Sequence, residues 1–453
     1  MIVGIDDTIA AIATPLGESA IGIVRLTGKD AFKVVDKIFR GKTKIMDAPT
    51  HTIHYGKIVD PATDKVVDEV LVMVMRAPHT YTREDMVEIN AHGGQAPLRK
   101  ILELLLKHGA RLAQPGEFTQ RAVLHGRIDL TQAQAVLEIV RAKTEEALYE
   151  AVAQLEGKLS TRMDELKDRL VDILTQLEFV IDFPDDADDT LVAGMYERLC
   201  NIRDSIATLL EAAQRGKLLR EGMELAIIGR PNVGKSSVFN ALLEEERAIV
   251  TPYPGTTRDL LEGWIDVKGV PVKLVDTAGI RETSDPVEQL GVERARRAVM
   301  RAWGIIYVFD QSEGILDEDI DTIKRLPNKP IIGVLNKNDL PSKVDGKALK
   351  RFNFPIVSVS ALKHRNISEL VSTIANSLDM QPSTYVMLHE YQVEALREAH
   401  AALTRICEGW HELTLDLVAY EVRCAINALG KITGEVTSED IFDRIFASFC
   451  VGK

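Results

Sequence analysis

Residues 224–236 read ELAIIGRPNVGKS, and this stretch decides the fold class of its part of the chain. An apolar run ending at Gly229 predicts a buried strand, and the spacing Gly-x-x-x-x-Gly-Lys-Ser that follows is typical of a phosphate-binding loop. Backbone N–H groups at the start of the next helix attract phosphate. Lys235 is expected to neutralise the β- and γ-phosphates, and Ser236 to hold Mg²⁺. The stretch therefore predicts an α/β nucleotide-binding domain.

Three later motifs also follow expected strands. Asp276, the first residue of DTAG, occupies the place from which a carboxylate reaches the Mg²⁺ shell. Asp339 closes the motif NKND, and its carboxylate can accept hydrogen bonds from N1–H and the exocyclic amine of guanine, a pair that adenine does not offer. Residues 360–362 read SAL, which suits a loop whose backbone contacts guanine O6. Because ligands bind at the carboxyl ends of parallel strands, the four motifs are expected to form one GTP site.

The segment 251–259, TPYPGTTRD, is expected to be a switch loop in which a threonine hydroxyl joins the Mg²⁺ shell when the γ-phosphate is present. Ile280 stands directly after DTAG, where a water-orienting glutamine is common, so a different polar group must orient the attacking water. Nearby polar candidates are Arg281, Glu282 and Glu288. The residues predicted to bind GTP are Asn232, Val233, Gly234, Lys235, Ser236, Ser237, Thr251, Thr256, Thr257, Asp276, Thr277, Ala278, Gly279, Asn336, Lys337, Asp339, Ser360, Ala361 and Leu362.

The sequences on the two sides of this domain have different patterns of apolar residues. Residues 1–118 carry short β-rich runs, such as 9–14, 21–25 and 70–75, with helical patterns near 30–39 and 95–108. From 119 apolar residues recur at helical spacing, with a break expected at Gly157. The predicted fold is multidomain, α+β and α/β. Its domains are an N-terminal α/β domain (1–118), a discontinuous helical domain (119–221 and 379–453) and an inserted G domain (222–378).

Composition limits the classes of protein. The 453 residues are 45% hydrophobic and 27% charged, with no apolar run long enough for a membrane span. The start of the sequence lacks a signal peptide, and four scattered cysteines predict neither a disulfide framework nor a zinc site. These features predict a cytoplasmic protein. The net charge of -13 argues against broad attraction to nucleic acid, so an RNA partner requires a local basic patch.

Several short motifs in the sequence resemble those of known GTPase families. PGTTRD at 254–259, with Asn232 in the phosphate loop, resembles the TrmE–Era–Der GTPases, whose G domain is Ras-like. Three more stretches narrow the resemblance to the MnmE/TrmE family of tRNA-modification GTPases. They are the run 7–25, the pair GEFTQRA (116–122) and DLTQAQA (129–135), and FASFCVGK (446–453). The resemblance covers essentially the whole chain.

The resemblance implies further site residues. A potassium ion takes the place of an arginine finger, Glu288 positions the water, and the N-terminal domain binds a tetrahydrofolate derivative (5,10-methylene or 5-formyl) and dimerises. Cys450 is a possible modification-site nucleophile, with a structural thiol as the alternative. The implied ligands are Ser236 and Thr257 for magnesium, Asn232, Thr251, Tyr253 and Thr256 for potassium, and Arg25, Glu88, Arg127 and Lys453 for folate. At Arg127 the family also has lysine.

The resemblance also implies a function. Family members act as homodimers with a flavin-dependent partner of the MnmG/GidA type. Together they install a carboxymethylaminomethyl or aminomethyl group at C5 of the wobble uridine of certain tRNAs. GTP hydrolysis there drives conformational change. The alternative is a ribosome-assembly or RNA-binding switch of the Era or Der kind, which predicts a small RNA-binding domain or a second G domain. A scaffold with a degenerate site is disfavoured because Lys235, Ser236, Asp276 and Asp339 are all present.

Overall fold

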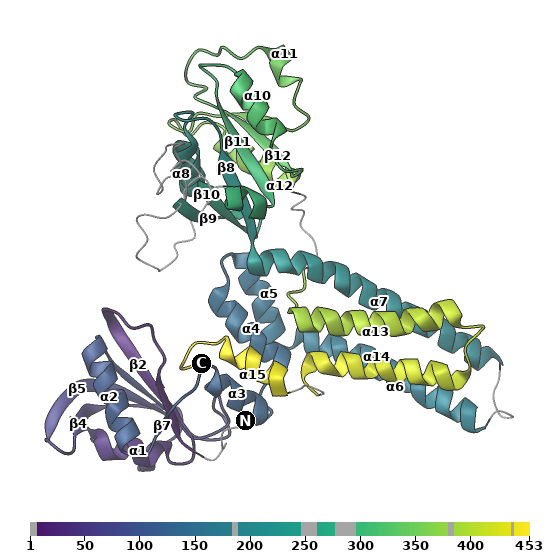
Figure 1. The fold of residues 1–453 in the computed structure, drawn as a ribbon. Coiled ribbons are helices and arrows are strands. Elements are labelled where there is room, and N and C mark those ends of the chain that lie inside the picture. Colours follow the sequence, from purple (N-terminus) through teal and green to yellow (C-terminus); the bar gives the residue numbers. More distant parts are fainter. Residues whose placement is uncertain (1–6, 184–188, 246–260, 277–295, 379–384, 436–438) are drawn as a thin grey trace. The chain divides into compact units, whose positions relative to one another are not determined.

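The chain forms two compact units, and Figure 1 labels the helices and strands that belong to them. A computed structural model describes residues 7–183, 189–245, 261–276, 296–378, 385–435 and 439–453. The first unit comprises 1–137, 154–199 and 401–453, and the second comprises 138–153 and 200–400. Helices α4 (Leu130–Arg141), α5 (Glu145–Leu155), α7 (Asp189–Glu221) and α13 (Glu390–Gly409) contribute residues to both. The four-part domain division given above remains a prediction.

The first unit contains a seven-stranded sheet in the order β3-β4-β5-β6-β2-β1-β7. All neighbouring pairs are antiparallel except β1 with β7. Helices α1 (Ala31–Ile38) and α2 (Gln95–Lys107) pack on the sheet, as the helical patterns predicted. The strands are β1 (Ile9–Ile12), β2 (Ser19–Thr27), β3 (Phe39–Gly41), β4 (Thr52–Asp60), β5 (Lys65–Met75), β6 (Met86–Gly93) and β7 (Arg111–Leu112).

Only one face of this sheet is fully covered. Side chains alternate along a strand, so Val70, Val72 and Val74 of β5 join the core shared with α1 and α2. Leu71 lies on the opposite face, where it is exposed and paired in register with exposed Tyr55 of β4. Ile53, one register step away on β4, is also exposed. The open face therefore carries large apolar side chains.

The remaining helices of the first unit include a packed pair, α6 (Lys158–Asp182) with α14 (Leu415–Thr433). Gly157 has φ +90° directly before α6, which confirms the expected break. Two shorter helices, α3 (Glu117–Leu124) and α15 (Glu439–Ala447), contact each other. Segments far apart in sequence thus meet here, and α15 leads into the segment 448–453.

The second unit contains a six-stranded sheet in the order β13-β12-β11-β8-β10-β9, parallel except at β9. Its strands are β8 (Met223–Ile228), β9 (Leu261–Val267), β10 (Val270–Asp276), β11 (Gly304–Asp310), β12 (Ile331–Asn336) and β13 (Ile356–Ser358). Helices of this unit are α5 (Glu145–Leu155), α8 (Lys235–Glu245), α10 (Asp317–Lys324), α11 (Gly346–Leu349) and α12 (Ile367–Ser377). The strands expected before the four nucleotide motifs are present as β8, β10, β12 and β13, and β9 pairs antiparallel with β10.

The structure qualifies the expectation about the cysteines. Cys200 and Cys407 are disulfide-bonded, whereas Cys424 and Cys450 are free thiols, so the chain does contain disulfide-bonded cysteines although no framework of several bridges. Across the described ranges, each helix is too short or too polar to cross a bilayer.

Candidate functional site

The phosphate loop lies between β8 and α8, as its sequence requires. Gly234 has φ +94°, and a Cβ there would lie 2.2 Å from Asn336 Nδ2, so only glycine fits. Lys235 starts α8, and its Nζ donates to the carbonyl oxygens of Gly229 (2.9 Å) and Arg230 (2.8 Å). Burial lowers the pKa of Lys235, and the nearby Asp276 charge opposes that shift. The ammonium is thus held inside the loop, where β- and γ-phosphates bind in such sites.

Ser236 and Asp276 bring two oxygen ligands together. The Ser236 hydroxyl donates to Asp276 Oδ2 over 2.7 Å, which joins the start of α8 to the end of β10. A hydroxyl and a carboxylate are hard oxygen ligands of the kind that Mg²⁺ prefers. The pair therefore fits the magnesium position that the sequence predicted.

Asn336, at the end of β12, connects the phosphate loop to the base-binding loop. Its Nδ2 donates to the carbonyl oxygen of Val233 (3.0 Å), and its Oδ1 accepts from the backbone N–H of Ala361 (3.1 Å). The neighbouring Lys337 donates to the carbonyl oxygen of Asn232 (3.0 Å) and is paired with the buried carboxylate of Asp310. Three motifs of the predicted site are thereby joined through side-chain contacts.

Asp339 is exposed beside this connection. Its Oδ1 accepts a hydrogen bond from the buried Ser360 hydroxyl at 2.6 Å, and this bond chiefly lowers the pKa of the Asp339 carboxyl. An ionised carboxylate that is oriented on one oxygen can accept two N–H bonds from a guanine edge. Ala361 is buried and Leu362 is exposed at the same strand end.

Several predicted residues lie outside the described ranges, so their placement remains a prediction. These are Thr251, Tyr253, Thr256, Thr257, Thr277, Ala278, Gly279 and Glu288. Among the described potassium and loop residues, Asn232 is exposed with φ +62°, Val233 is buried and Ser237 is exposed.

A second cluster forms in the first unit around Arg25. We use "Arg25 cluster" for Arg25, Glu88, Phe118, Gly452 and Lys453. Arg25 Nε and Nη2 both lie 2.7 Å from Glu88 Oε1, across the β2–β6 register pair. Arg25 Nη1 donates to the carbonyl oxygen of Gly452 (3.1 Å), and its Cζ lies 5.7 Å from the Phe118 ring centroid. Lys453 is half-buried, and burial followed by the Arg25 charge lowers its pKa.

The segment 448–453 is fixed against the N-terminal region by its main chain. Val451 forms a β-bridge with Pro115, and Gly116 N–H donates to the Cys450 carbonyl oxygen at 3.4 Å. Gly452 has φ +97°, and a Cβ there would lie 2.7 Å from the Ile12 carbonyl oxygen, so glycine is required. The Cys450 thiol itself is exposed.

Arg127 stands over the ring of Tyr81, with Cζ 4.8 Å from the centroid. Burial raises the pKa of Tyr81, whereas its hydrogen bond with Thr119 and the charges of Arg127 and Arg25 oppose the shift. Both arginines therefore act on one phenol. The four residues that the resemblance implies for folate thus lie in one region, together with Tyr81, Phe118 and the Gly452 carbonyl, to which the sequence had assigned no role.

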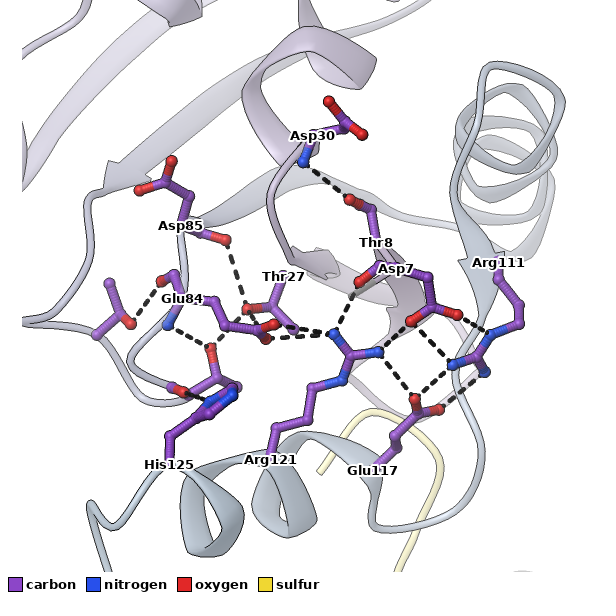
Figure 2. A network of polar contacts seen from close by, with 12 residues as sticks. Asp7, Thr8, Thr27, Asp30, Glu84, Asp85, Arg111, Glu117, Arg121 and His125 are labelled. Carbon is purple, nitrogen blue, oxygen red and sulfur yellow. Dashed lines mark hydrogen bonds and ion pairs between the residues drawn. The ribbon is translucent and has the colours of Figure 1, made fainter. Parts of the chain in front are cut away.

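A buried network supports this region (Figure 2). Arg121, 2% exposed, lies between Glu84 on one side and Asp7 and Glu117 on the other. Arg111 binds the same Asp7 and Glu117 carboxylates from the opposite direction. The loop containing Tyr81 and Glu84 is therefore joined to α3, which carries Phe118 and precedes Arg127.

Within the described part of the chain, histidine, cysteine and carboxylate side chains form no group of three that could bind a metal. The magnesium and potassium ligands implied by the resemblance are hydroxyl and amide groups, and four of the six lie outside that part.

Comparison with known sequences gives the family. A sequence model of the MnmE helical domain matches residues 130–450, and one for the N-terminus of the GTP-binding protein TrmE matches 8–127. The tRNA modification GTPase MnmE of Ligilactobacillus salivarius is 45% identical over 99% of this chain and 98% of that protein. The chain belongs to the MnmE family. The MnmE of Geobacillus thermodenitrificans is 46% identical over 99% of both chains.

Membership of the MnmE family and the geometry of the phosphate loop agree. The chain is a GTP-binding GTPase with an N-terminal domain, a helical domain and a P-loop domain. The fold also resembles Era bound to MgGDPNP and 16S ribosomal RNA nucleotides, at 31% identity over 40% of this chain and 66% of that one. At a TM-score of 0.30, this likeness adds nothing to the assignment.

Proposed function

We propose that this protein is a potassium-activated GTPase that acts with a flavin-dependent partner of the MnmG/GidA type. Together they add a carboxymethylaminomethyl or aminomethyl group at C5 of the wobble uridine of certain tRNAs. The observation that supports this most is that the folate residues implied by the family gather around Arg25 and the segment 450–453. A simple nucleotide switch has no use for such a second cluster.

In the GTP site each described residue has a chemical task. Lys235 neutralises phosphate charge, and Ser236 with Asp276 holds Mg²⁺. Asp339 selects guanine through its carboxylate, and Asn336 holds the base-binding loop next to the phosphate loop. Potassium, held by Asn232, Thr251, Tyr253 and Thr256, stabilises the charge that develops between the β- and γ-phosphates. Glu288 orients the attacking water.

The Arg25 cluster has the donor set for a tetrahydrofolate derivative. Both contacts from Arg25 to Glu88 end on Oε1, and among the described residues none reaches Oε2, which can accept from an amino-pyrimidine edge. Arg25, Arg127 and Lys453 supply three cations against the single Glu88 carboxylate, which favours an anionic glutamate tail. When bound, the folate supplies the one-carbon unit.

The open face of the N-terminal sheet supports a homodimer. Exposed Ile53, Tyr55 and Leu71 lie on the same face as Arg25 and Glu88, because Met73 of β5 pairs with both Ile53 and Glu88 in register. Burial of this face against a second copy would remove apolar surface from water. The Arg25 cluster would then border the dimer interface. The proposal also includes a cytoplasmic location for the protein, and tRNA and the flavin-dependent protein as its binding partners.

Mass analysis of wobble uridines from cells that lack the protein tests this function. Unmodified or 2-thio-only uridine in the affected tRNAs is expected, with recovery when the wild-type gene is returned. A normal uridine profile combined with immature ribosomal RNA would instead support a ribosome-assembly GTPase. A gene with the Lys235→Ala change, whose product is expected to be inactive, is returned in parallel as the control for expression.

A further inference from the structure

Arg230 lies inside the phosphate loop, but its side chain contacts acids outside the nucleotide motifs. Its Nε lies 3.1 Å from both carboxylate oxygens of Asp319, and its Nη1 lies 3.1 Å from Glu313 Oε2. The two acids differ in environment, because the Asp319 side chain is 0% exposed whereas that of Glu313 is 56% exposed. The pair with Asp319 is therefore the one shielded from water.

Asp319 is fixed by two further donors. Its Oδ1 accepts from the Tyr307 hydroxyl (3.0 Å), and its Oδ2 accepts from the backbone N–H of Leu316 at the start of α10 (3.0 Å). Tyr307 is fully buried on β11, the strand next to β8. A buried carboxylate with this many partners cannot be displaced without leaving charge or donors unsatisfied. Asp319 thus provides a rigid anchor on the neighbouring strand and helix.

The anchored residue also touches the lysine of the site. The carbonyl oxygen of Arg230 accepts from Lys235 Nζ at 2.8 Å, beside the Gly229 carbonyl at 2.9 Å. The main chain of Arg230 therefore sets where the Lys235 ammonium lies. A shift of the Arg230 side chain would pass to this carbonyl through its own residue.

We propose that the buried Asp319–Arg230 ion pair, braced by Tyr307, is a positioning device that holds the phosphate loop so that Lys235 meets the β- and γ-phosphates. Asp319 reaches the phosphate loop through the Arg230 side chain, and Tyr307 acts by holding Asp319 in place. The pair is a permanent brace and carries no proton or phosphate. This role would serve the proposed GTPase site, and it does not depend on binding of folate or tRNA.

The test compares three substitutions in the full-length protein. Asp319→Asn keeps the shape but offers one acceptor oxygen where Arg230 Nε now meets two. Tyr307→Phe removes only the brace, and Glu313→Gln alters the exposed contact to the same guanidinium. Because misplacing a group by about 1 Å can cost on the order of 100-fold in rate, Asp319→Asn is expected to lower kcat/KM for GTP by about 10- to 100-fold. Tyr307→Phe should have a smaller effect, and Glu313→Gln almost none.

A second measurement separates positioning from mere stability. Affinity for a fluorescent GTP analogue is measured for each variant in the wild-type and Lys235→Ala backgrounds, after urea titration has established the folded fraction. If the pair acts through Lys235, Asp319→Asn weakens binding in the wild-type background but not further when Lys235 is absent. An equal loss in both backgrounds, or wild-type kcat/KM per folded molecule, overturns the proposal. Should Asp319→Asn fail to fold, the same cycle with Tyr307→Phe decides.

Discussion

Asn336 Nδ2 donates to the carbonyl oxygen of Val233 across 3.0 Å, so the end of β12 that leads to Asp339 is bonded to the phosphate loop. The same amide accepts the Ala361 N–H through Oδ1. The loops proposed to bind the base and the phosphates therefore share contacts with one side chain. Loss of Asn336 would disturb both ends of the nucleotide at once.

Guanine selection by Asp339 gives the first prediction. Asp339→Asn presents an amide donor where the carboxylate accepted, so GTP should bind more weakly and xanthosine triphosphate more tightly. Hydrogen bonds to charged groups contribute about 1.5–3 kcal/mol, which corresponds to roughly 10- to 100-fold in affinity. Titration with fluorescent nucleotides measures the change, and unchanged GTP affinity would reject Asp339 as the reader.

Potassium dependence gives the second prediction. GTP turnover should be much higher in KCl than in NaCl at matched ionic strength, and Asn232→Ala should abolish the difference. Glu288→Ala should lower kcat on the order of 100-fold or more while nucleotide affinity stays nearly constant, because water positioning acts in the transition state. Glu282→Ala is the matched control, since it removes a neighbouring acid. Equal rates in the two salts would contradict the potassium assignment.

The segment 450–453 gives the third prediction. Truncation after Phe449 removes the Gly452 carbonyl from Arg25 and the Lys453 cation, so binding of 5-formyltetrahydrofolate should weaken and tRNA modification should stop. Potassium-stimulated GTP hydrolysis should persist, because the GTP site uses none of these residues. Calorimetric titration with folate and a phosphate-release assay measure the two activities. Normal modification by the truncated protein would refute the role of this segment.

Cys450 itself can be tested separately. The Cys450→Ser change keeps the backbone bonds of Cys450 to Gly116 and Lys453, and the thiol is exposed. Loss of tRNA modification with intact folate binding would support a nucleophile. Full modification activity would leave the thiol with a structural role only.

Acid should loosen the network around Arg121. Burial alone would raise the pKa of Glu117, but hydrogen bonds from Arg111, Gln114 N–H and Arg121 outweigh it and lower the pKa; Asp7 behaves likewise with the two arginines. A carboxyl whose folded pKa lies below its unfolded value stabilises the fold above the unfolded pKa and loses that contribution as pH falls through the folded one. Protection of α3 peptides in hydrogen–deuterium exchange should therefore hold at neutral pH and decline only as pH falls from about 5 to about 3, through the lowered pKa values of these carboxyls.

Two variants check the sign of this effect. Glu117→Gln should flatten the pH dependence, after correction for intrinsic exchange. Burial raises the pKa of Glu84 against the opposing charge of Arg121, so its contribution is lost as pH rises and Glu84→Gln should steepen the dependence. If protection changes with pH at the same slope in both variants, the opposite contributions proposed for Glu117 and Glu84 are ruled out.

The nucleotide motifs could be located from sequence because their chemistry is local. Gly229 through Ser236 specifies a loop within eight residues, and the strands that end at Asp276 and Asn336 are mostly apolar, with Lys273 as an interruption in the first. By contrast, β6 alternates polar and apolar residues from Glu88 to His92, a period-two signal that could have identified it. The antiparallel strand β9 has Gly263 and Glu262 in its pattern and gives a weaker signal.

The polar network and the Arg25 cluster could not be derived from spacing. Arg121 and Asp7 are 114 residues apart, and the decisive atoms on Gly452 and Asp7 include main-chain carbonyl oxygens that any residue carries. The resemblance gave Arg25, Glu88, Arg127 and Lys453, but neither Tyr81 nor Phe118. The Arg230–Asp319 pair could not be predicted from spacing either, because its partners are 89 residues apart.

The contact between Arg25 and Gly452 spans 427 residues, and this imposes an order on biosynthesis. A ribosome releases β2 and β6 early, and the whole GTP site emerges well before residue 452. A nascent chain can therefore contain the whole GTP site while the Arg25 cluster still lacks Gly452 and Lys453. Products of premature termination would keep the GTP site and lack the complete Arg25 cluster, so they are expected to compete with the full-length protein for GTP.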